Sequence, residues 1–272
     1  MVSSALESSA IKTGAGWQWQ IWENKPYLTC TLLQDFAHGF FSRSFSPLEP
    51  VDMTPVLDPD ATAFRLKQVH GDRNLTPTEI QHHPTTEYDF PPADGLVSDA
   101  PGQALWVASA DCTPVLIADA RSRNVAAIHA GWRGTAKRIV PKVVERLLAQ
   151  GSQPGDLRVA LGPSIAGDIY QVCEEVAAEV GRSLPIAAAL GQDQDVIAFL
   201  QTLPDCPVFD DPQPGRIRLD VRKMSALQLQ LQGLAPEQLA IAPHCTFGEP
   251  ELFFSYRREK LKKVQWSGIV SR

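Results

Sequence analysis

Three residues with metal-binding side chains lie in separate segments: His70 in LKQVHG, Cys112 in ASADCTPV and His129 in AIHAGWRG. Each stands at or near the end of an apolar run. A thiolate and two imidazoles suit Zn²⁺, and three protein ligands leave a fourth position open for water or substrate. The set therefore predicts a metal site that performs chemistry. The alternative is that Cys112 is a small buried apolar residue and both histidines are core residues with satisfied hydrogen bonds.

The segment after the second histidine favours the metal interpretation. HAGWRG contains two glycines, a tryptophan and Arg133, and such a turn can present backbone amides and a guanidinium to an anion beside the metal. Asp111, next to Cys112, offers a group that can orient a ligand or contact a substrate. Structural salt bridges would explain both charged residues equally well.

The elements that must position these residues follow from the apolar pattern. Three short apolar runs before the HAGWRG turn are separated by turn residues, as in adjacent buried strands, so His129 ends a central strand. Thr135 can cap the helix that follows, and Pro141 should kink that helix or mark its true start. Strands are expected at residues 17–22, 27–33, 63–70, 104–109, 114–119, 125–130, 157–162, 216–221 and 238–244. Helices are expected at residues 135–151, 173–184 and 222–234.

Strands interleaved with helices indicate an α/β or α+β fold, and the hairpin-like start favours mixed sheets over a wholly parallel one. We therefore expect a single domain of packed mixed β-sheets flanked by helices. Residues 1–16 are rich in Ser, Ala and Gly and are expected to be flexible. Residues 17–272 are expected to form one catalytic domain.

Composition argues against several classes of protein. The 272 residues are 44% hydrophobic and 21% charged, which is enough for a full core. A net charge of -6 without a long run of like charges gives no footprint for nucleic acid. The chain has neither a long apolar span nor a signal-peptide pattern, so we expect a cytoplasmic protein without a membrane partner. Five cysteines without a CxxC pair argue against a disulfide framework, and no pattern indicates an oligomeric state.

Several motifs occur in the order found in a known bacterial family: ADGLVSD, ADCTPV, HAGWRGT, LGPSI and CT followed by FFSYRRE. The resemblance as a whole spans residues 36–258, and HAGWRG together with ADC is quite specific. The chain thus resembles the family once described as polyphenol oxidases or laccases, which is related to an animal laccase domain-containing protein. Its members are better described as purine nucleoside phosphorylases that also deaminate adenosine.

This resemblance implies a zinc-dependent phosphorylase. The family's zinc ligands are the histidine of QVH, the cysteine of ADC and the histidine of HAGWRG, which fall here on His70, Cys112 and His129. The implied substrates are inorganic phosphate with adenosine or inosine, and guanosine and S-methyl-5'-thioadenosine are further candidates. The implied products are the free base and ribose 1-phosphate, with adenosine deamination as a side activity. The family fold is a single α/β domain of mixed sheets with outer helices.

Two segments depart from the family pattern and are expected to change the substrate pocket. Relatives usually follow HGF with a Gly-rich loop and an LNLG segment, whereas this chain has HGFFSRSFSPLEPVDMTPV. After SYRR, EKLKKVQW replaces the usual basic-then-glycine continuation. Substrate preference is therefore the property expected to differ most from the family.

Phosphorolysis requires a phosphate held against the anomeric carbon, and guanidinium groups suit phosphate oxygens. Zinc can orient the phosphate, and in deamination it lowers the pKa of a water that attacks purine C6. The candidate phosphate-binding residues are Arg43, Arg133, and Arg257 or Arg258. Asp111 is the candidate proton shuttle, with a turn or helix cap as its alternative role. The candidates for stacking on the base are Trp132, Phe40 and Tyr256, with core packing as the alternative.

Three other functions stay open. The His-Cys-His set also occurs in blue-copper centres, so Cu²⁺ and polyphenol oxidation are one alternative. Against it, multicopper oxidases use many histidines in HxH repeats, and this chain has 6 histidines and no HxH. Cys112 can instead be the nucleophile of a hydrolase, with His70 or His129 as its base. The third alternative is a non-catalytic nucleoside-sensing protein.

Overall fold

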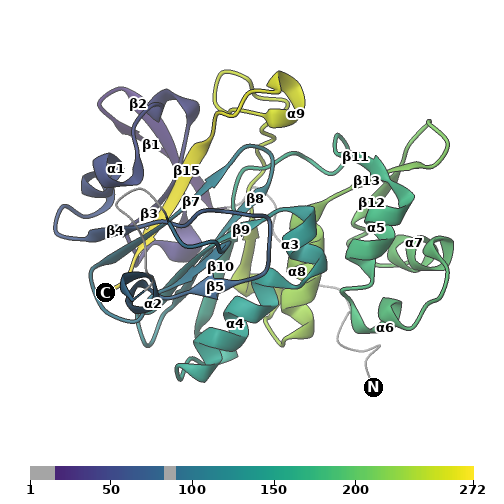
Figure 1. Ribbon diagram of the computed structural model, residues 1–272, viewed down its shortest axis with the longest axis horizontal. Coiled ribbons are helices and arrows are strands. Elements are labelled where there is room, and N and C mark those ends of the chain that lie inside the picture. The colour runs from purple at the N-terminus through teal and green to yellow at the C-terminus, as the bar shows by residue number, and fades with distance from the viewer. Residues whose placement is uncertain (1–15, 83–89) are drawn as a thin grey trace.

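The computed structural model of this chain describes residues 16–82 and 90–272, which form two packed mixed sheets and a smaller third sheet (Figure 1). The first sheet has the order β1 (Trp17–Trp22), β2 (Lys25–Cys30), β3 (His38–Phe41), β15 (Gln265–Val270), β7 (Gln103–Ser109) and β4 (Thr62–Phe64). The second has the order β14 (Leu239–Ile241), β10 (Leu157–Leu161), β8 (Thr113–Asp119), β9 (Val125–Ala130), β6 (Gly95–Val97) and β5 (Asn74–Leu75). The third consists of β11 (Gln171–Cys173), β13 (Arg216–Leu219) and β12 (Val208–Asp210).

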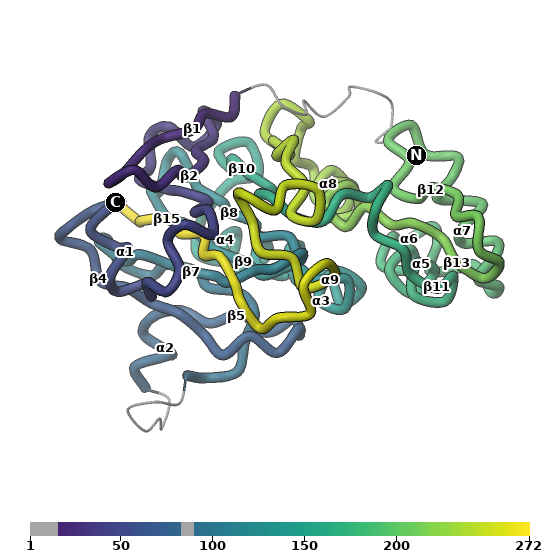
Figure 2. The backbone as a smooth tube through the Cα atoms, turned by 90° about the horizontal axis from the view of Figure 1, so that it is seen from above, coloured from purple at the N-terminus to yellow at the C-terminus, as the bar shows by residue number. Residues whose placement is uncertain are grey.

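Helices flank these sheets, which confirms the expected fold class. They are α1 (Pro50–Leu57), α2 (Pro77–Gln81), α3 (Trp132–Ala136), α4 (Ile139–Ala149), α5 (Glu174–Gly181), α6 (Pro185–Ala188), α7 (Asp193–Gln201), α8 (Val221–Leu231) and α9 (Tyr256–Glu259). Most neighbouring strands pair antiparallel, but β4 runs parallel to β7, β10 to β14 and β5 to β6. The third sheet and helices α5 to α7 lie together at one end of the molecule in both views (Figures 1 and 2).

The two large sheets share one apolar layer, and β8 shows why residues 114–118 in its middle are continuously apolar. Leu116 and Ala118 face the layer between the sheets, where Leu105 of β7 also packs. Val115 and Ile117 face the other way, into the layer beneath α4 and α8. Because both faces of the strand are covered, every position favours an apolar residue. The sequence prediction of central buried strands is confirmed.

Several expected elements are shorter than their patterns predict. The strands expected at residues 27–33 and 238–244 end at Cys30 and Ile241. The strand expected at residues 63–70 ends at Phe64. The helix expected from residue 135 is two helices, because Arg138 adopts a left-handed backbone conformation with φ of 63° and separates α3 from α4. Thr135 therefore lies inside α3 rather than capping a helix. Pro141 falls in the first turn of α4, where its missing N–H costs no helical hydrogen bond.

Residues 1–15 of the expected flexible N-terminus lie outside the described residues. In the part of the chain that the structure describes, no helix is long and apolar enough to cross a membrane.

Candidate metal centre

The ends of two paired strands bring Cys112 and His129 together. Cys112 directly precedes β8 and His129 is the penultimate residue of β9, and Pro114 pairs with His129 across these antiparallel strands. His70 arrives from the loop after β4, and its ring centroid lies 4.8 Å from that of His129. The metal-binding atoms of the three residues lie within 4.8 Å of one another. Within residues 16–82 and 90–272, this is the one group of three His, Cys, Asp or Glu side chains found close enough to hold a metal ion.

A buried carboxylate that the sequence analysis missed holds both histidines in place. Asp94 is fully buried and accepts a 2.9 Å hydrogen bond from His129 Nδ1. It also accepts backbone N–H bonds from Val69, His70 and Gly71 at 3.1, 2.9 and 2.7 Å. These bonds hold the turn in which His70 has a φ of 58°. Since Nδ1 of His129 is engaged, Nε2 is left for a metal. Asp94 belongs to the ADGLVSD motif, which was the available signal.

The electrostatics of the cluster favour a thiolate. Burial raises the pKa of Cys112, but the charge of His129 and hydrogen bonds from His129 and His70 outweigh burial and bring that pKa down to about 6. Burial lowers the pKa of His129, but the Cys112 charge and the hydrogen bond to Asp94 raise it to about 9. A thiolate is the form of cysteine that binds metals. The donor chemistry therefore fits a zinc ion with one open position.

Gly131 leaves the space that Cys112 occupies. A Cβ atom at this position would lie 2.8 Å from the Cys112 sulfur and 3.4 Å from Cδ2 of His70. Contacts below 3.0 Å force one group to move. The close approach of Cys112 and His70 therefore requires a glycine at the N-cap position of α3.

Gly131→Ala is expected to weaken zinc binding at least about tenfold, because the thiolate must leave its position among the ligands. The measurement is a competition titration of zinc with a chromogenic chelator, alongside circular dichroism to confirm folding. Gly155→Ala is the matched control, since its Cβ would meet nothing within 4 Å. Equal zinc affinity of the Gly131 variant and the wild type would contradict this account of the glycine.

The cluster lies on the wall of a cavity of about 820 Å³. Arg133 and Arg257 line the same cavity, and their guanidinium groups stack on Trp132 at 4.4 Å and on Tyr170 at 4.9 Å. Burial raises the pKa of Tyr170 to about 12, so its hydroxyl stays protonated and able to donate. No motif in the sequence marks Tyr170 as a residue of the site.

Ser109 and Asp111 lie shortly before Cys112 in the sequence and also line the cavity. Ser109 is 3% exposed, and its hydroxyl has no partner among the described residues. Asp111 accepts 2.7 Å hydrogen bonds from the Thr246 hydroxyl and from the backbone N–H of Arg257. The carboxylate thus fastens the segment that carries Arg257 beside the cluster. Its role as proton shuttle stays a proposal.

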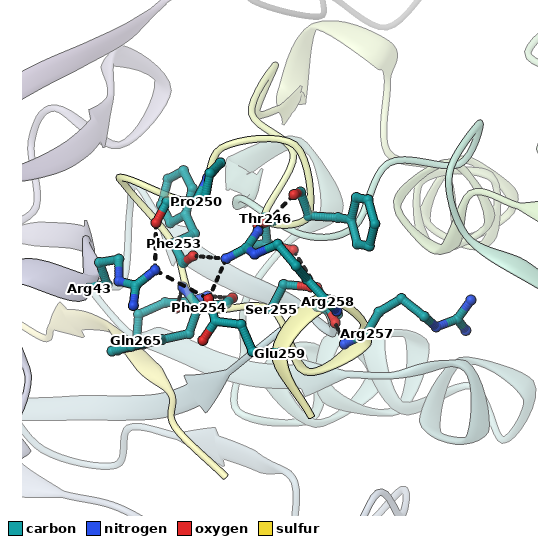
Figure 3. A network of polar contacts seen from close by, with 12 residues as sticks. Arg43, Thr246, Pro250, Phe253, Phe254, Ser255, Arg257, Arg258, Glu259 and Gln265 are labelled. Atoms are coloured by element: carbon teal, nitrogen blue, oxygen red, sulfur yellow. Dashed lines mark hydrogen bonds and ion pairs between the residues drawn. The ribbon is translucent and has the colours of Figure 1, made fainter. Parts of the chain in front are cut away.

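The structure does not bring every candidate residue to this cavity. Phe40 is 1% exposed and packs against Trp17, with ring centroids 5.4 Å apart. Arg43 donates to the carbonyl of Pro250 and to Glu259, and Arg258 pairs with the same Glu259 (Figure 3). Neither arginine nor Phe40 is among the lining residues, whereas the other stacking candidates, Trp132 and Tyr256, are.

The Arg43–Glu259–Arg258 network instead shapes the C-terminal segment. Arg258 donates to the carbonyls of Thr246, Phe247 and Phe253, and so holds the chain around α9 together. Figure 3 shows that the side chain of Arg257 points away from this network. Arg257 is therefore the arginine of SYRRE that reaches the cavity.

Comparisons with known proteins identify the family of this chain. A family model described as multi-copper polyphenol oxidoreductase laccase matches residues 53–270. A purine nucleoside phosphorylase of Synechocystis sp. is 55% identical over 256 residues, which cover 94% of this chain and 97% of that protein. A protein named adenosine deaminase, from an unknown prokaryotic organism, is 33% identical over 168 residues, 61% of this chain and 56% of that protein.

Solved structures share the fold. YlmD from Geobacillus stearothermophilus superposes with a TM-score of 0.74 at 22% identity and covers 93% of this chain and 98% of its own. The hypothetical protein YfiH of Bacillus licheniformis gives a TM-score of 0.73 at 24% identity, with coverage of 93% and 99%.

Proposed function

Because this chain belongs to the family described as multi-copper polyphenol oxidoreductase laccase, whose relatives include purine nucleoside phosphorylases, we propose that it cleaves purine nucleosides with phosphate in a zinc-dependent reaction. The observation that carries the proposal is the His70, Cys112 and His129 cluster on the wall of a cavity that also contains Arg133 and Arg257. Adenosine and inosine are the proposed substrates, and adenosine deamination is the proposed side activity, which the name of one relative supports.

The residues of the cavity suit each requirement of phosphorolysis. Arg133 and Arg257 can hold phosphate oxygens against the anomeric carbon, and Trp132 offers a face for the purine. Zinc at the cluster would supply a Lewis acid for phosphate and, in deamination, for an attacking water. The Tyr170 hydroxyl can donate a hydrogen bond to a developing negative charge. Asp111 is the proposed group that moves a proton to or from the base.

Arg133→Ala and Arg257→Ala are each expected to raise the KM for phosphate about ten- to hundredfold, because each removes a charge-assisted hydrogen bond worth about 1.5–3 kcal/mol. Initial rates at varied phosphate measure this. Arg121→Ala is the control, since Arg121 is exposed in the turn after β8, at the opposite end of that strand from Cys112. An unchanged KM for phosphate in both cavity variants would show that neither arginine binds phosphate.

The direct test of the function is incubation of the protein with adenosine and phosphate. We expect adenine and ribose 1-phosphate in equal amounts, and inosine as a lesser product from deamination. Cys112→Ala should abolish the release of adenine. Undiminished release by this variant would remove the metal centre from the mechanism.

A hydrolase with a cysteine nucleophile is the second candidate, because the cluster also has the arrangement of a catalytic triad. Cys112 pairs with His129, whose Nδ1 lies 2.9 Å from Asp94. A hydrolase of this kind has no use for His70, whereas a metal site uses His70 as the third of its binding side chains. Protein that carries no zinc and whose Cys112 reacts readily with iodoacetamide would favour the hydrolase.

A further inference from the structure

The large cavity is basic although the chain is acidic. Seven basic side chains line it and two acidic ones do, in a protein with a net charge of -6. The metal centre and phosphorolysis account for Arg133 and Arg257. They do not account for Lys260, Lys262 and Lys263, which lie in the segment between α9 and β15.

The two acidic side chains of the lining are already engaged. Glu49 forms an ion pair with Arg65. The carboxylate of Asp111 accepts hydrogen bonds from Thr246 and Arg257. Neither therefore supplies a carboxylate for the lysines, and none of the ion pairs found in the described residues includes Lys262 or Lys263. Clustered cations of this kind attract an anion.

A second, smaller pocket adjoins the cavity at these lysines. It has a volume of about 190 Å³, and the residues that line both spaces are Glu49, Lys262, Lys263, Val264 and Trp266. The Glu49 carboxylate is paired with Arg65. Ser42 lines the smaller pocket but not the large cavity. Its side chain is buried, with 1% of the residue exposed, and its hydroxyl has no hydrogen-bond partner among the described residues. Buried hydroxyls are nearly always hydrogen-bonded, so an unpartnered one in a pocket wall points to a bound group that completes it.

We propose that this pocket, lined by Lys262, Lys263 and the Ser42 hydroxyl, binds the 5'-phosphate of a purine nucleoside monophosphate. The inference rests on the proposed function, since it takes a nucleoside in the large cavity as given. His70, Cys112, His129, Arg133 and Arg257 line only the large cavity, whereas Lys262 and Lys263 line both spaces. The site therefore has one anion position beside the metal for the attacking phosphate and another toward the smaller pocket for a phosphate carried by the substrate.

The reaction balances with inorganic phosphate as the second substrate. The bond between C1' and N9 breaks, and its electron pair and one proton go to the base. A phosphate oxygen forms the new bond to C1'. Inosine 5'-monophosphate would thus give hypoxanthine and ribose 1,5-bisphosphate.

Calorimetric titrations with inosine and with inosine 5'-monophosphate, both without phosphate, test the proposal. We expect the wild type to bind the monophosphate at least about tenfold more tightly than inosine, a difference of about 1.4 kcal/mol. Lys262→Gln/Lys263→Gln should lose this preference and keep its affinity for inosine within about twofold. Lys25→Gln/Lys223→Gln removes the same charge outside both spaces and should keep the preference.

Equal affinity of the wild type for both ligands, binding of neither, or a preference that survives in the Lys262/Lys263 variant would each overturn the inference. The last result would place the substrate phosphate at the arginines instead. The proposed function fails separately, if adenosine and phosphate yield no adenine. If the protein cleaves adenosine but shows no preference for the monophosphate, the proposed function is supported and the second anion position is contradicted.

Discussion

Cys112→Ser is expected to reduce bound zinc from about one ion per chain to near zero and to lower the rate of phosphorolysis at least about hundredfold. Cys112 contributes the thiolate of the set, and its pKa of about 6 makes that thiolate available near neutral pH. A serine hydroxyl is far harder to ionise and is a poor zinc ligand. The two histidines alone then leave the ion with too few protein ligands.

Elemental analysis of the purified variant and initial rates with adenosine and phosphate measure this effect. Cys173→Ser is the matched control, because Cys173 is partly buried in the third sheet, away from the cavity lining. The control should keep both its zinc and its activity. A Cys112→Ser protein that retains stoichiometric zinc would show that the thiolate is not a ligand.

Asp94→Asn is expected to weaken zinc binding about ten- to hundredfold while the protein stays folded. The carboxylate accepts bonds from His129 Nδ1 and from three backbone N–H groups, and an amide has one acceptor oxygen with which to replace it. The NH₂ group of the asparagine would face N–H groups that also donate. The hydrogen bonds that orient His129 and hold the turn at His70 would therefore be lost. Burial also makes the change costly for stability, by roughly 1–3 kcal/mol for a buried group left unsatisfied.

Asp119→Asn separates positioning of the ligands from general stability. Asp119 is equally buried and accepts backbone N–H bonds from Arg121 and Ser122, but at the opposite end of β8 from Cys112. Both variants should lower the denaturant midpoint, and only the Asp94 variant should lose zinc affinity in a chelator competition. A similar zinc affinity in the two variants would reduce Asp94 to a structural role.

Patterns local to one element were readable from the sequence. The middle of β8 and most of β9 are apolar because sheet and helices cover both faces, and His129 lies at the end of its strand, one residue before the last. The sequence likewise predicted the three residues of the candidate metal centre from their types, and the structure brings these residues together. The mixed sheets with outer helices follow from the order of the elements and are confirmed.

Features that depend on long-range contacts were not readable. Asp94 acts on His70 and His129, which lie 24 and 35 positions away, and its motif gives no hint of those partners. The sequence offers Arg43 and Arg133 equally as phosphate-binding residues. In the structure, Arg43 donates hydrogen bonds to Glu259 and to the Pro250 carbonyl, outside the cavity. A guanidinium takes whichever acceptors the fold presents, and the fold is set by distant packing.

The segments that depart from the family pattern both reach the cavity. Glu49 comes from the segment after HGF, and residues 260–264 come from the segment after SYRR. The prediction that these departures change the pocket therefore has a structural basis, since both supply lining side chains. Lys260, Lys262 and Lys263 of the second segment supply three of the seven basic side chains that line the cavity.

Metal removal and restoration tests the central claim most directly. The protein is dialysed against a strong chelator, its zinc content is verified by elemental analysis, and phosphorolysis of adenosine is measured before and after titration with zinc. We expect activity to fall with zinc content and to return fully at about one ion per chain. Full phosphorolysis by protein shown to contain no metal would contradict a catalytic metal centre at His70, Cys112 and His129.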